Sequence, residues 1–284
     1  MQTNIVDLYQ YFNIKRPDGA KGYLHSYVIE KYDYCPDRVR PAMLVVPGGG
    51  YALVSAREAE PVAFKFLAEG YSAFVLDYSV EPIAFPYQLI EGCMAVAYIR
   101  DNAEKFGIDP GHVGAVGFSA GGHLTAMLAT MYNEKEVVEF LKDKSALCRP
   151  DAVILSYPVI SSDENISHLD SILRLSGKDG EIIQRISLEK RVDKNSSPAY
   201  IWTTVNDATV PMENSFVMAK AYKEAGVPFE LHVFENGMHG LSVSTEEVAV
   251  KGDMDISSYV REPIQAWIKG SLLWLKERGF RIKI

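Results

Sequence analysis

The residues best placed to do chemistry lie in the stretch GFSAGG at positions 117–122. It matches the pattern G-x-S-x-G, in which a serine stands at a sharp turn between a strand and a helix. An apolar segment, HVGAV, precedes the stretch, and a second one, HLTAMLATM, follows it. In such a strained turn the hydroxyl projects from the edge of the sheet, and the flanking glycines avoid collisions. Ser119 is therefore the predicted nucleophile; the alternative is a chance glycine-rich turn, which the flanking strand and helix disfavour.

A second glycine-rich stretch, PGGGY at positions 47–51, directly follows the apolar segment AMLVV. Consecutive glycines let the backbone adopt positive φ and approach a ligand closely. N–H groups of such a loop, together with the N–H of the residue after the nucleophile, stabilise the oxyanion of a tetrahedral intermediate. We expect Gly49, Gly50 and Ala120 to be these donors; the alternative is a flexible turn.

A serine hydroxyl needs a base within hydrogen-bond reach, because it is a poor nucleophile near neutral pH. Among the 6 histidines, His239 in the stretch ENGMHG directly follows the last predicted strand, so we expect it to be the general base. His25 and His232 lie within predicted strands, and His112 lies at the opposite edge of the sheet. His123 lies on the helix after the serine, where a core role is expected. For His168, in a polar stretch, a surface position is favoured over contact with substrate.

The expected acid that orients this histidine is Asp207, in the stretch NDATVP after the apolar segment AYIWTTV. The resulting chain order of serine, aspartate and histidine is the one that strand–turn–helix serine enzymes use. Asp77 also ends a predicted strand, but it precedes the nucleophile, and we interpret it as a structural loop residue. No H-E-x-x-H or C-x-x-C pattern is present, so we expect no metal and no cofactor.

Short apolar runs alternate with helical periodicity along the chain, which predicts an α/β fold with a mostly parallel sheet and helices on both faces. The most mixed run, 23–30, is expected to be an antiparallel edge strand. Ligands bind at the carboxyl ends of such strands. The expected strands are 23–30, 42–46, 73–78, 113–118, 152–157, 199–205 and 229–234. The expected helices are 58–69, 87–106, 121–132, 212–225 and 263–278.

We expect a single domain over residues 1–284, since α/β folds of this length are often undivided. Two polar stretches, 160–198 and 241–262, interrupt the alternation. Each is interpreted either as a lid or substrate-binding surface, or as a surface loop with a short helix.

The composition disfavours several kinds of partner and location. The 284 residues are 48% hydrophobic and carry a formal net charge of -8 without a basic run, which disfavours nucleic acid or an anionic membrane as a partner. The 3 cysteines do not suggest a disulfide framework. With no signal-peptide pattern and no apolar run of transmembrane length, a cytoplasmic protein is expected.

The chain resembles the hormone-sensitive-lipase-like esterases and, more closely, bacterial acetyl xylan esterases and related "sugar hydrolases" of the α/β-hydrolase fold. The resemblance rests on VVPGGGY, FGIDPGHVGAVGFSAGGHL, the D-x-x-V-P of 207–211, and GMHG, which together span nearly the whole chain. Many lipase-like relatives have histidine before the three glycines, where this chain has Pro47. This difference leaves the oxyanion donors in place, but the substrate preference of lipases is not transferred to this chain.

The resemblance implies a serine carboxylesterase that hydrolyses short acyl esters, with acetyl groups on carbohydrates as candidate substrates. The partner would be a small ester, such as an acetylated oligosaccharide; a homo-oligomer is compatible with the sequence. An arylformamidase-like amidase and a prolyl-oligopeptidase-like peptidase are alternatives, although such peptidases usually carry an aromatic residue where this chain has Ala120. A non-catalytic binding protein of this fold is a further alternative. Such proteins typically lack the base, whereas Ser119, Asp207 and His239 are all present here.

Overall fold

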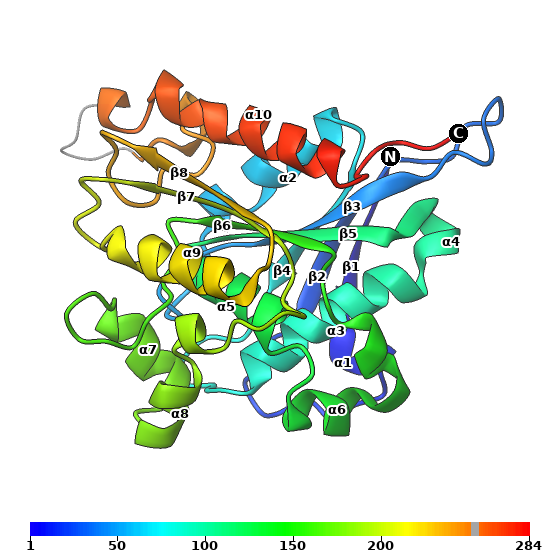
Figure 1. Cartoon of the computed structure of the whole chain (residues 1–284). Coiled ribbons are helices and arrows are strands. Elements are labelled where there is room, and N and C mark those ends of the chain that lie inside the picture. Colours follow the sequence, from blue (N-terminus) through cyan, green and yellow to red (C-terminus); the bar gives the residue numbers. More distant parts are fainter. Residues whose placement is uncertain (251–255) are drawn as a thin grey trace.

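The computed structural model describes residues 1–250 and 256–284. In this part of the chain, eight strands form one sheet in the order β1-β2-β4-β3-β5-β6-β7-β8 (Figure 1). The pairs β1·β2 and β2·β4 are antiparallel and the other neighbours are parallel, which confirms the expected mostly parallel α/β sheet. The strands are β1 (Gln2–Asp7), β2 (Tyr23–Val28), β3 (Arg40–Val46), β4 (Ser72–Asp77), β5 (Ile108–Phe118), β6 (Ala152–Ser156), β7 (Ala199–Thr204) and β8 (Phe229–Phe234).

Helices cover both faces of the sheet, with α2 and α10 on one face and α3, α5 and α9 on the other (Figure 1). None of the helices within 1–250 and 256–284 combines the length and apolar character needed to cross a bilayer. The α-helices are α1 (Leu8–Tyr11), α2 (Glu60–Ala68), α3 (Tyr87–Asp101), α4 (Ala103–Phe106), α5 (Ala120–Thr130), α6 (Lys135–Leu141), α7 (Leu169–Ser176), α8 (Gly180–Arg185), α9 (Glu213–Ala225) and α10 (Glu262–Glu277). The 3-10 helices are η1 (Ala56–Glu58), η2 (Lys142–Leu147), η3 (Leu188–Lys190), η4 (Glu246–Val248) and η5 (Ile256–Ser258).

The central strands are buried on both faces, as their continuous apolar sequences predict. In β3, Ala42, Leu44 and Val46 pack with α3 and α5, whereas Met43 and Val45 point to the opposite face and pack with α2 and α10. Successive side chains of a strand point to opposite faces, so every residue of such a strand must be apolar. Two hydrophobic clusters result, one on each face of the sheet.

The predicted edge strand is wrong in one respect. The strand β2 is antiparallel as expected, but it lies second in the sheet, because β1 pairs with it from Gln2↔Val28 to Asp7↔Tyr23. The side chains of β1 are exposed or half-buried, so its sequence QTNIVD carries little hydrophobic pattern. This strand is defined by its backbone pairing with β2, and such pairing leaves no hydrophobic pattern in the sequence.

Two other boundaries differ from prediction. The expected helix 87–106 is divided at Asn102 into α3 and α4, because the Asn102 side chain donates to the Tyr98 carbonyl and competes with the helix backbone. The strand β5 begins at Ile108, five residues earlier than expected, and its pairing with β3 shifts register between Arg40 and Ala42. Pro110 and Gly111 in this irregular part conceal the strand signal.

The two polar stretches contribute to the core. Within 160–198, α7, α8 and η3 bury apolar side chains such as Ile172, Leu175 and Leu188 against the cluster around α3 and α5. Within 241–262, Leu241 and Val243 are buried in the cluster around α2 and α10. Residues 251–255 of the second predicted excursion lie outside the described residues. The single domain and the role of 160–198 as a lid stay predictions.

A buried carboxylate joins the N-terminal segment to the sheet. Glu91 of α3 is fully buried and accepts hydrogen bonds from the Tyr9 hydroxyl (2.9 Å), the Ser79 N–H (2.6 Å) and the Ser79 hydroxyl (2.5 Å). Burial raises the pKa of Glu91 from 4.5 to about 7 despite these donors. The folded protein therefore retains a proton that the unfolded chain loses between these values, and stability falls as pH rises through this window.

We expect Glu91→Gln to change stability in a pH-dependent way. The shift of the Glu91 pKa corresponds to about 3 kcal/mol in the free energy of unfolding. Between pH 5 and pH 8 the natural chain should therefore lose about 2 kcal/mol of stability relative to the variant. Urea unfolding at both pH values measures this difference. The exposed Glu104→Gln in α4 is the control for loss of a carboxylate. A stability difference that is the same at both pH values would contradict the interpretation.

Candidate active site

The predicted nucleophile lies at a strained turn between β5 and α5. Ser119 has φ of 54° and ψ of -119°, a backbone conformation that costs free energy and persists only where the surroundings enforce it. Its N–H donates to the Ser156 carbonyl (3.0 Å), and its own carbonyl accepts from the N–H groups of His123 and Val159 (both 3.1 Å). These bonds hold the turn between the carboxyl end of β6 and the first turn of α5.

Glycine is required on both sides of this turn, which confirms the expected crowding. A Cβ atom added to Gly117 would lie 2.1 Å from Thr125 Oγ1 and 2.2 Å from the Gly121 carbonyl oxygen. A Cβ atom on Gly121 would lie 2.2 Å from the carbonyl oxygens of Val46 and Pro47. The backbone of α5 therefore approaches the carboxyl end of β3 directly, and this contact brings the glycine-rich loop next to Ser119.

The structure brings Ser119, His239 and Asp207 together although they are far apart in sequence. His239 Nε2 lies 2.8 Å from Ser119 Oγ, and His239 Nδ1 lies 2.7 Å from Asp207 Oδ2. Both flanking loops are fixed to each other, because the Gly237 N–H donates to Asn206 Oδ1 (2.7 Å). This bond joins the loop after β7, which carries the aspartate, to the loop after β8, which carries the histidine.

The partners of Asp207 determine the tautomer of the histidine. The carboxylate side chain is 1% exposed, and its Oδ1 accepts from the N–H groups of Thr209 and Val210 (both 2.9 Å). Its Oδ2 is an acceptor as well, so His239 Nδ1 carries the hydrogen. His239 Nε2 is then free to accept the proton of the Ser119 hydroxyl, which is the arrangement that a general base requires.

Three backbone donors next to Ser119 have no acceptor among the described residues: the N–H groups of Gly49, Gly50 and Ala120. The neighbouring Gly48 N–H differs, because it donates to Glu58 Oε2 (2.8 Å). A Cβ atom on Gly48 would lie only 3.0 Å from Ser119 Cβ, so the loop passes directly beside the nucleophile turn. Uncommitted donors at this place are what an oxyanion hole needs.

Side chains from two elements fix the glycine-rich loop. The Tyr78 hydroxyl donates to the Pro47 carbonyl (2.7 Å), and the buried Tyr51 hydroxyl lies 2.9 Å from His123 Nδ1. Since His123 Nε2 contacts the Ile186 carbonyl (2.9 Å), Nε2 carries the hydrogen and Nδ1 accepts from Tyr51. Burial lowers the pKa of His123 to about 4, so its imidazole is neutral at pH 7. The expected core role of His123 is confirmed.

A face of α7 lies over the glycine-rich loop. Arg174 Nη1 and Ser171 Oγ both lie 3.7 Å from the position that a Cβ atom on Gly50 would take. His168 Nδ1 lies 2.8 Å from Ser171 Oγ. Burial, followed by the electrostatic effect of the neighbouring His239, lowers the pKa of His168. His168 was expected on a polar surface stretch; it is half-buried on the same face as these two residues.

The remaining candidates are placed elsewhere. Asp77 ends β4 and pairs with Lys21 (2.8 Å), in keeping with a structural role. Two of the other histidines have partners away from the site: His112 lies 2.8 Å from Asp109, and His232 lies 3.0 Å from Glu230. The sequence did not indicate the buried Glu58 and Tyr157 beside the site, because a lone glutamate and a lone tyrosine match no motif.

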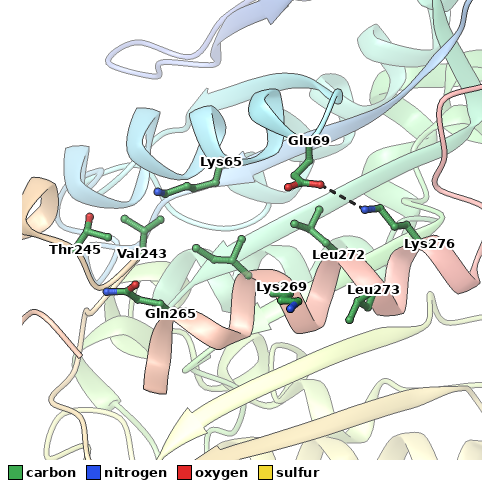
Figure 2. A pocket seen from close by; sticks show the side chains of 10 residues that line it. Lys65, Glu69, Val243, Thr245, Gln265, Lys269, Leu272, Leu273 and Lys276 are labelled. Carbon is green, nitrogen blue, oxygen red and sulfur yellow. Dashed lines mark hydrogen bonds and ion pairs between the residues drawn. The ribbon is translucent and has the colours of Figure 1, made fainter. Parts of the chain in front are cut away.

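A hollow of about 440 Å³ lies between α2 and α10, bordered by residues such as Lys65, Val243 and Gln265 (Figure 2). It borders the segment after His239 but contains none of the six predicted site residues. Within the described ranges, no group of three or more histidine, cysteine, aspartate or glutamate side chains is arranged to hold a metal ion.

Comparisons with known proteins agree with this fold. The chain is 40% identical over 223 residues to endo-1,4-beta-xylanase B of Butyrivibrio fibrisolvens, covering 76% of this chain and 35% of that protein. It is 33% identical to the acetylxylan esterase of Xylanibacter ruminicola, covering 72% of this chain and 42% of that protein. The chain thus spans less than half the length of these two relatives.

A solved structure matches over almost the entire chain. It is the acetyl ester-xyloside bifunctional hydrolase of Caldicellulosiruptor lactoaceticus. The two proteins are 31% identical with a TM-score of 0.81, and the match covers 98% of this chain and 97% of that one.

The sheet and the turn at Ser119 define an α/β-hydrolase. The BD-FAE family model matches residues 34–222, and the chain belongs to this family. The predicted resemblance to α/β-hydrolase esterases is thereby confirmed.

We expect Gly121→Ala to destabilise the protein by several kcal/mol, because its Cβ atom would meet backbone carbonyl oxygens that cannot move away. Gly180→Ala is the matched control, since a Cβ atom at that helical position has open space within 4 Å. Thermal unfolding of both variants measures the difference. A Gly121→Ala protein as stable as the Gly180→Ala control would contradict the described contact between α5 and β3.

Proposed function

We propose that this protein is a serine carboxylesterase that hydrolyses short-chain esters, above all acetyl esters, with Ser119, His239 and Asp207 as its catalytic triad. The observation that carries the proposal is the continuous hydrogen-bonded series from Asp207 through His239 to Ser119. Next to it lie the uncommitted N–H groups of Gly49 and Gly50. Nucleophile, base, orienting acid and oxyanion donors are together the components of acyl transfer.

The proposed reaction has two steps. Ser119 Oγ attacks the ester carbonyl while His239 Nε2 accepts the hydroxyl proton, and the oxyanion receives hydrogen bonds from the loop and from Ala120 N–H. His239 then donates this proton to the leaving alcohol, which leaves an acyl-enzyme. Water, deprotonated by His239, hydrolyses that intermediate and releases the acid. Asp207 orients the imidazole and stabilises its charged form throughout.

The position of the first forty residues in the fold supports the preference for short acyl groups. They form β1, α1 and β2 at the edge of the sheet, separated by β4 and β3 from β5 and its nucleophile, and do not lie as a helical cap over the site. Each methylene of a long acyl chain left in water forgoes about 0.8 kcal/mol of burial free energy. Because these residues extend the sheet instead of covering Ser119, they offer a long acyl chain no apolar surface at the site.

A carbohydrate as the alcohol is supported by the polar face of α7. His168, Ser171 and Arg174 lie beside Gly50, and the Arg174 guanidinium pairs with the carboxylates of Glu81 (3.3 Å) and Asp170 (3.8 Å). This face therefore offers both hydrogen-bond donors and acceptors, which the hydroxyl groups of a sugar can pair with. The printed names of two similar proteins, an acetylxylan esterase and an acetyl ester-xyloside hydrolase, point in the same direction.

Substitutions in the proposed triad give the direct test. Ser119→Ala should abolish ester hydrolysis and labelling by a fluorophosphonate probe. Asp207→Asn should lower kcat by about 10⁴ with the fold preserved, because the amide would favour the wrong imidazole tautomer. Asp77→Asn is the matched control, since Asp77 pairs with Lys21 instead. Turnover by Ser119→Ala, or greater damage from Asp77→Asn, would refute the assignment.

Substrate preference is tested with a hydrolysis panel. We expect kcat/KM for p-nitrophenyl acetate to exceed that for the octanoate at least tenfold, and acetate to be released from acetylated xylo-oligosaccharides. N-formylkynurenine and a proline anilide test the amidase and peptidase alternatives, and p-nitrophenyl xyloside tests glycosidase activity. A maximum at eight carbons or more, or rapid N-formylkynurenine cleavage without acetate release, would defeat the proposal.

A further inference from the structure

We propose that Glu58 is a positioning residue that sets the oxyanion loop and the loop of His239 at their working distance from each other. This inference rests on the proposed function, because it assigns a second set of residues to the same reaction. Its basis is one buried carboxylate in the short helix η1, which bonds to the oxyanion loop directly and to the loop of His239 through Tyr157.

The first contact fixes the oxyanion loop. Glu58 is 4% exposed, and its Oε2 accepts from the Gly48 N–H at 2.8 Å. Gly48 directly precedes the two glycines whose N–H groups are free to bind an oxyanion. A charged acceptor on the preceding N–H orients the peptide planes that follow. Loss of this bond would let the donors of Gly49 and Gly50 move, and such donors act only at a defined position.

The second contact reaches the histidine. Glu58 Oε1 accepts from the Tyr157 hydroxyl at 2.7 Å, and that hydroxyl accepts from the Ser242 N–H at 2.9 Å. Burial, together with the charge of Glu58, raises the pKa of Tyr157 well above 10, so the hydroxyl keeps the proton it donates. The Tyr157 ring packs edge-on against the His239 ring, with centroids 5.0 Å apart. The carboxylate thus supports the base through a single tyrosine.

The preceding residue reinforces the same connection. The Arg57 guanidinium donates to the carbonyl oxygens of Gly240 (2.9 Å) and Val248 (2.6 Å), and the Arg57 carbonyl accepts from the Ser242 hydroxyl (2.7 Å). Further along this segment, Val243 lies between α2 and α10 beside the hollow of Figure 2. The segment after His239 is therefore held from η1 on one side and packed against two helices on the other.

A purely structural role predicts something different from a positioning role. Loss of a structural bond lowers the amount of folded protein, but each folded molecule keeps its kcat. Displacement of oxyanion donors lowers kcat with little change in KM, because the donors stabilise the transition state more than the bound ester. The division between kcat and KM, normalised to the number of reactive serines, therefore separates the two roles.

The chain offers a matched control in the same helix region. Glu60 accepts from the Tyr27 hydroxyl at 2.8 Å, just as Glu58 accepts from Tyr157, but it contacts neither loop. The variants Glu58→Gln and Glu60→Gln therefore each remove a carboxylate that accepts from a tyrosine, buried in the first case and half-buried in the second. Tyr157→Phe and Tyr27→Phe remove the hydroxyls that donate to these carboxylates.

The experiment measures p-nitrophenyl acetate hydrolysis by these four variants, with active sites counted by the end point of fluorophosphonate labelling. We expect Glu58→Gln to lower kcat about 10- to 100-fold and Tyr157→Phe about tenfold, with KM within about twofold of the natural value. Glu60→Gln and Tyr27→Phe should stay within about twofold in kcat. The double variant Glu58→Gln/Tyr157→Phe should lose less than the product of the single losses, because both act through one network.

A kcat per active site for Glu58→Gln and Tyr157→Phe equal to that of their controls would overturn the inference. If Glu58→Gln does not fold, the volume-conserving Tyr157→Phe decides the question alone. Failure of the proposed function gives a different pattern, since Ser119→Ala would then retain activity. An inactive Ser119→Ala protein together with a fully active Glu58→Gln protein would refute only the positioning role.

Discussion

The structure depends on a close contact between backbones, that of Gly121 in α5 against the carboxyl end of β3. A Cβ atom at this position would lie 2.2 Å from the carbonyl oxygens of Val46 and Pro47, so no side chain separates the two elements. The helix that follows the nucleophile and the loop that follows β3 must then meet. Their meeting places Ser119 in a strained conformation and puts the N–H groups of Gly49 and Gly50 beside it.

Buried carboxylates hold the surrounding parts of the molecule, each in a different way. Asp207 is satisfied by two backbone N–H groups and the His239 ring, and it lies at the site itself. Glu58 connects the two loops that flank the site, one directly and the other through Tyr157. Glu91 lies further away, where burial raises its pKa to about 7 and makes the attachment of the N-terminal segment sensitive to pH. The hydrogen-bond donors around each carboxylate decide which role it can have.

The surroundings of the site come from distant parts of the chain. In this chain the N-terminal segment extends the sheet through β1 and β2, and the stretch 160–198 supplies α7 above Gly50. The same stretch buries Ile172 and Leu175 in the core, so its polar face is supported by an apolar one. A helix held in this way can present His168 and Ser171 at fixed positions.

The sequence by itself determined the parts of this protein whose signal is local. Continuous apolar runs predicted the central strands, because both faces of such strands are buried, and G-x-S-x-G predicted the turn at Ser119, because sterics allow little else there. Strand β1 and the network of Glu58 and Tyr157 escaped prediction. The strand is defined by pairing with β2, and the network joins residues 99 positions apart by one hydrogen bond. Only the tertiary structure decides such contacts, since a hydrogen bond between distant residues leaves no periodic or compositional trace in either segment.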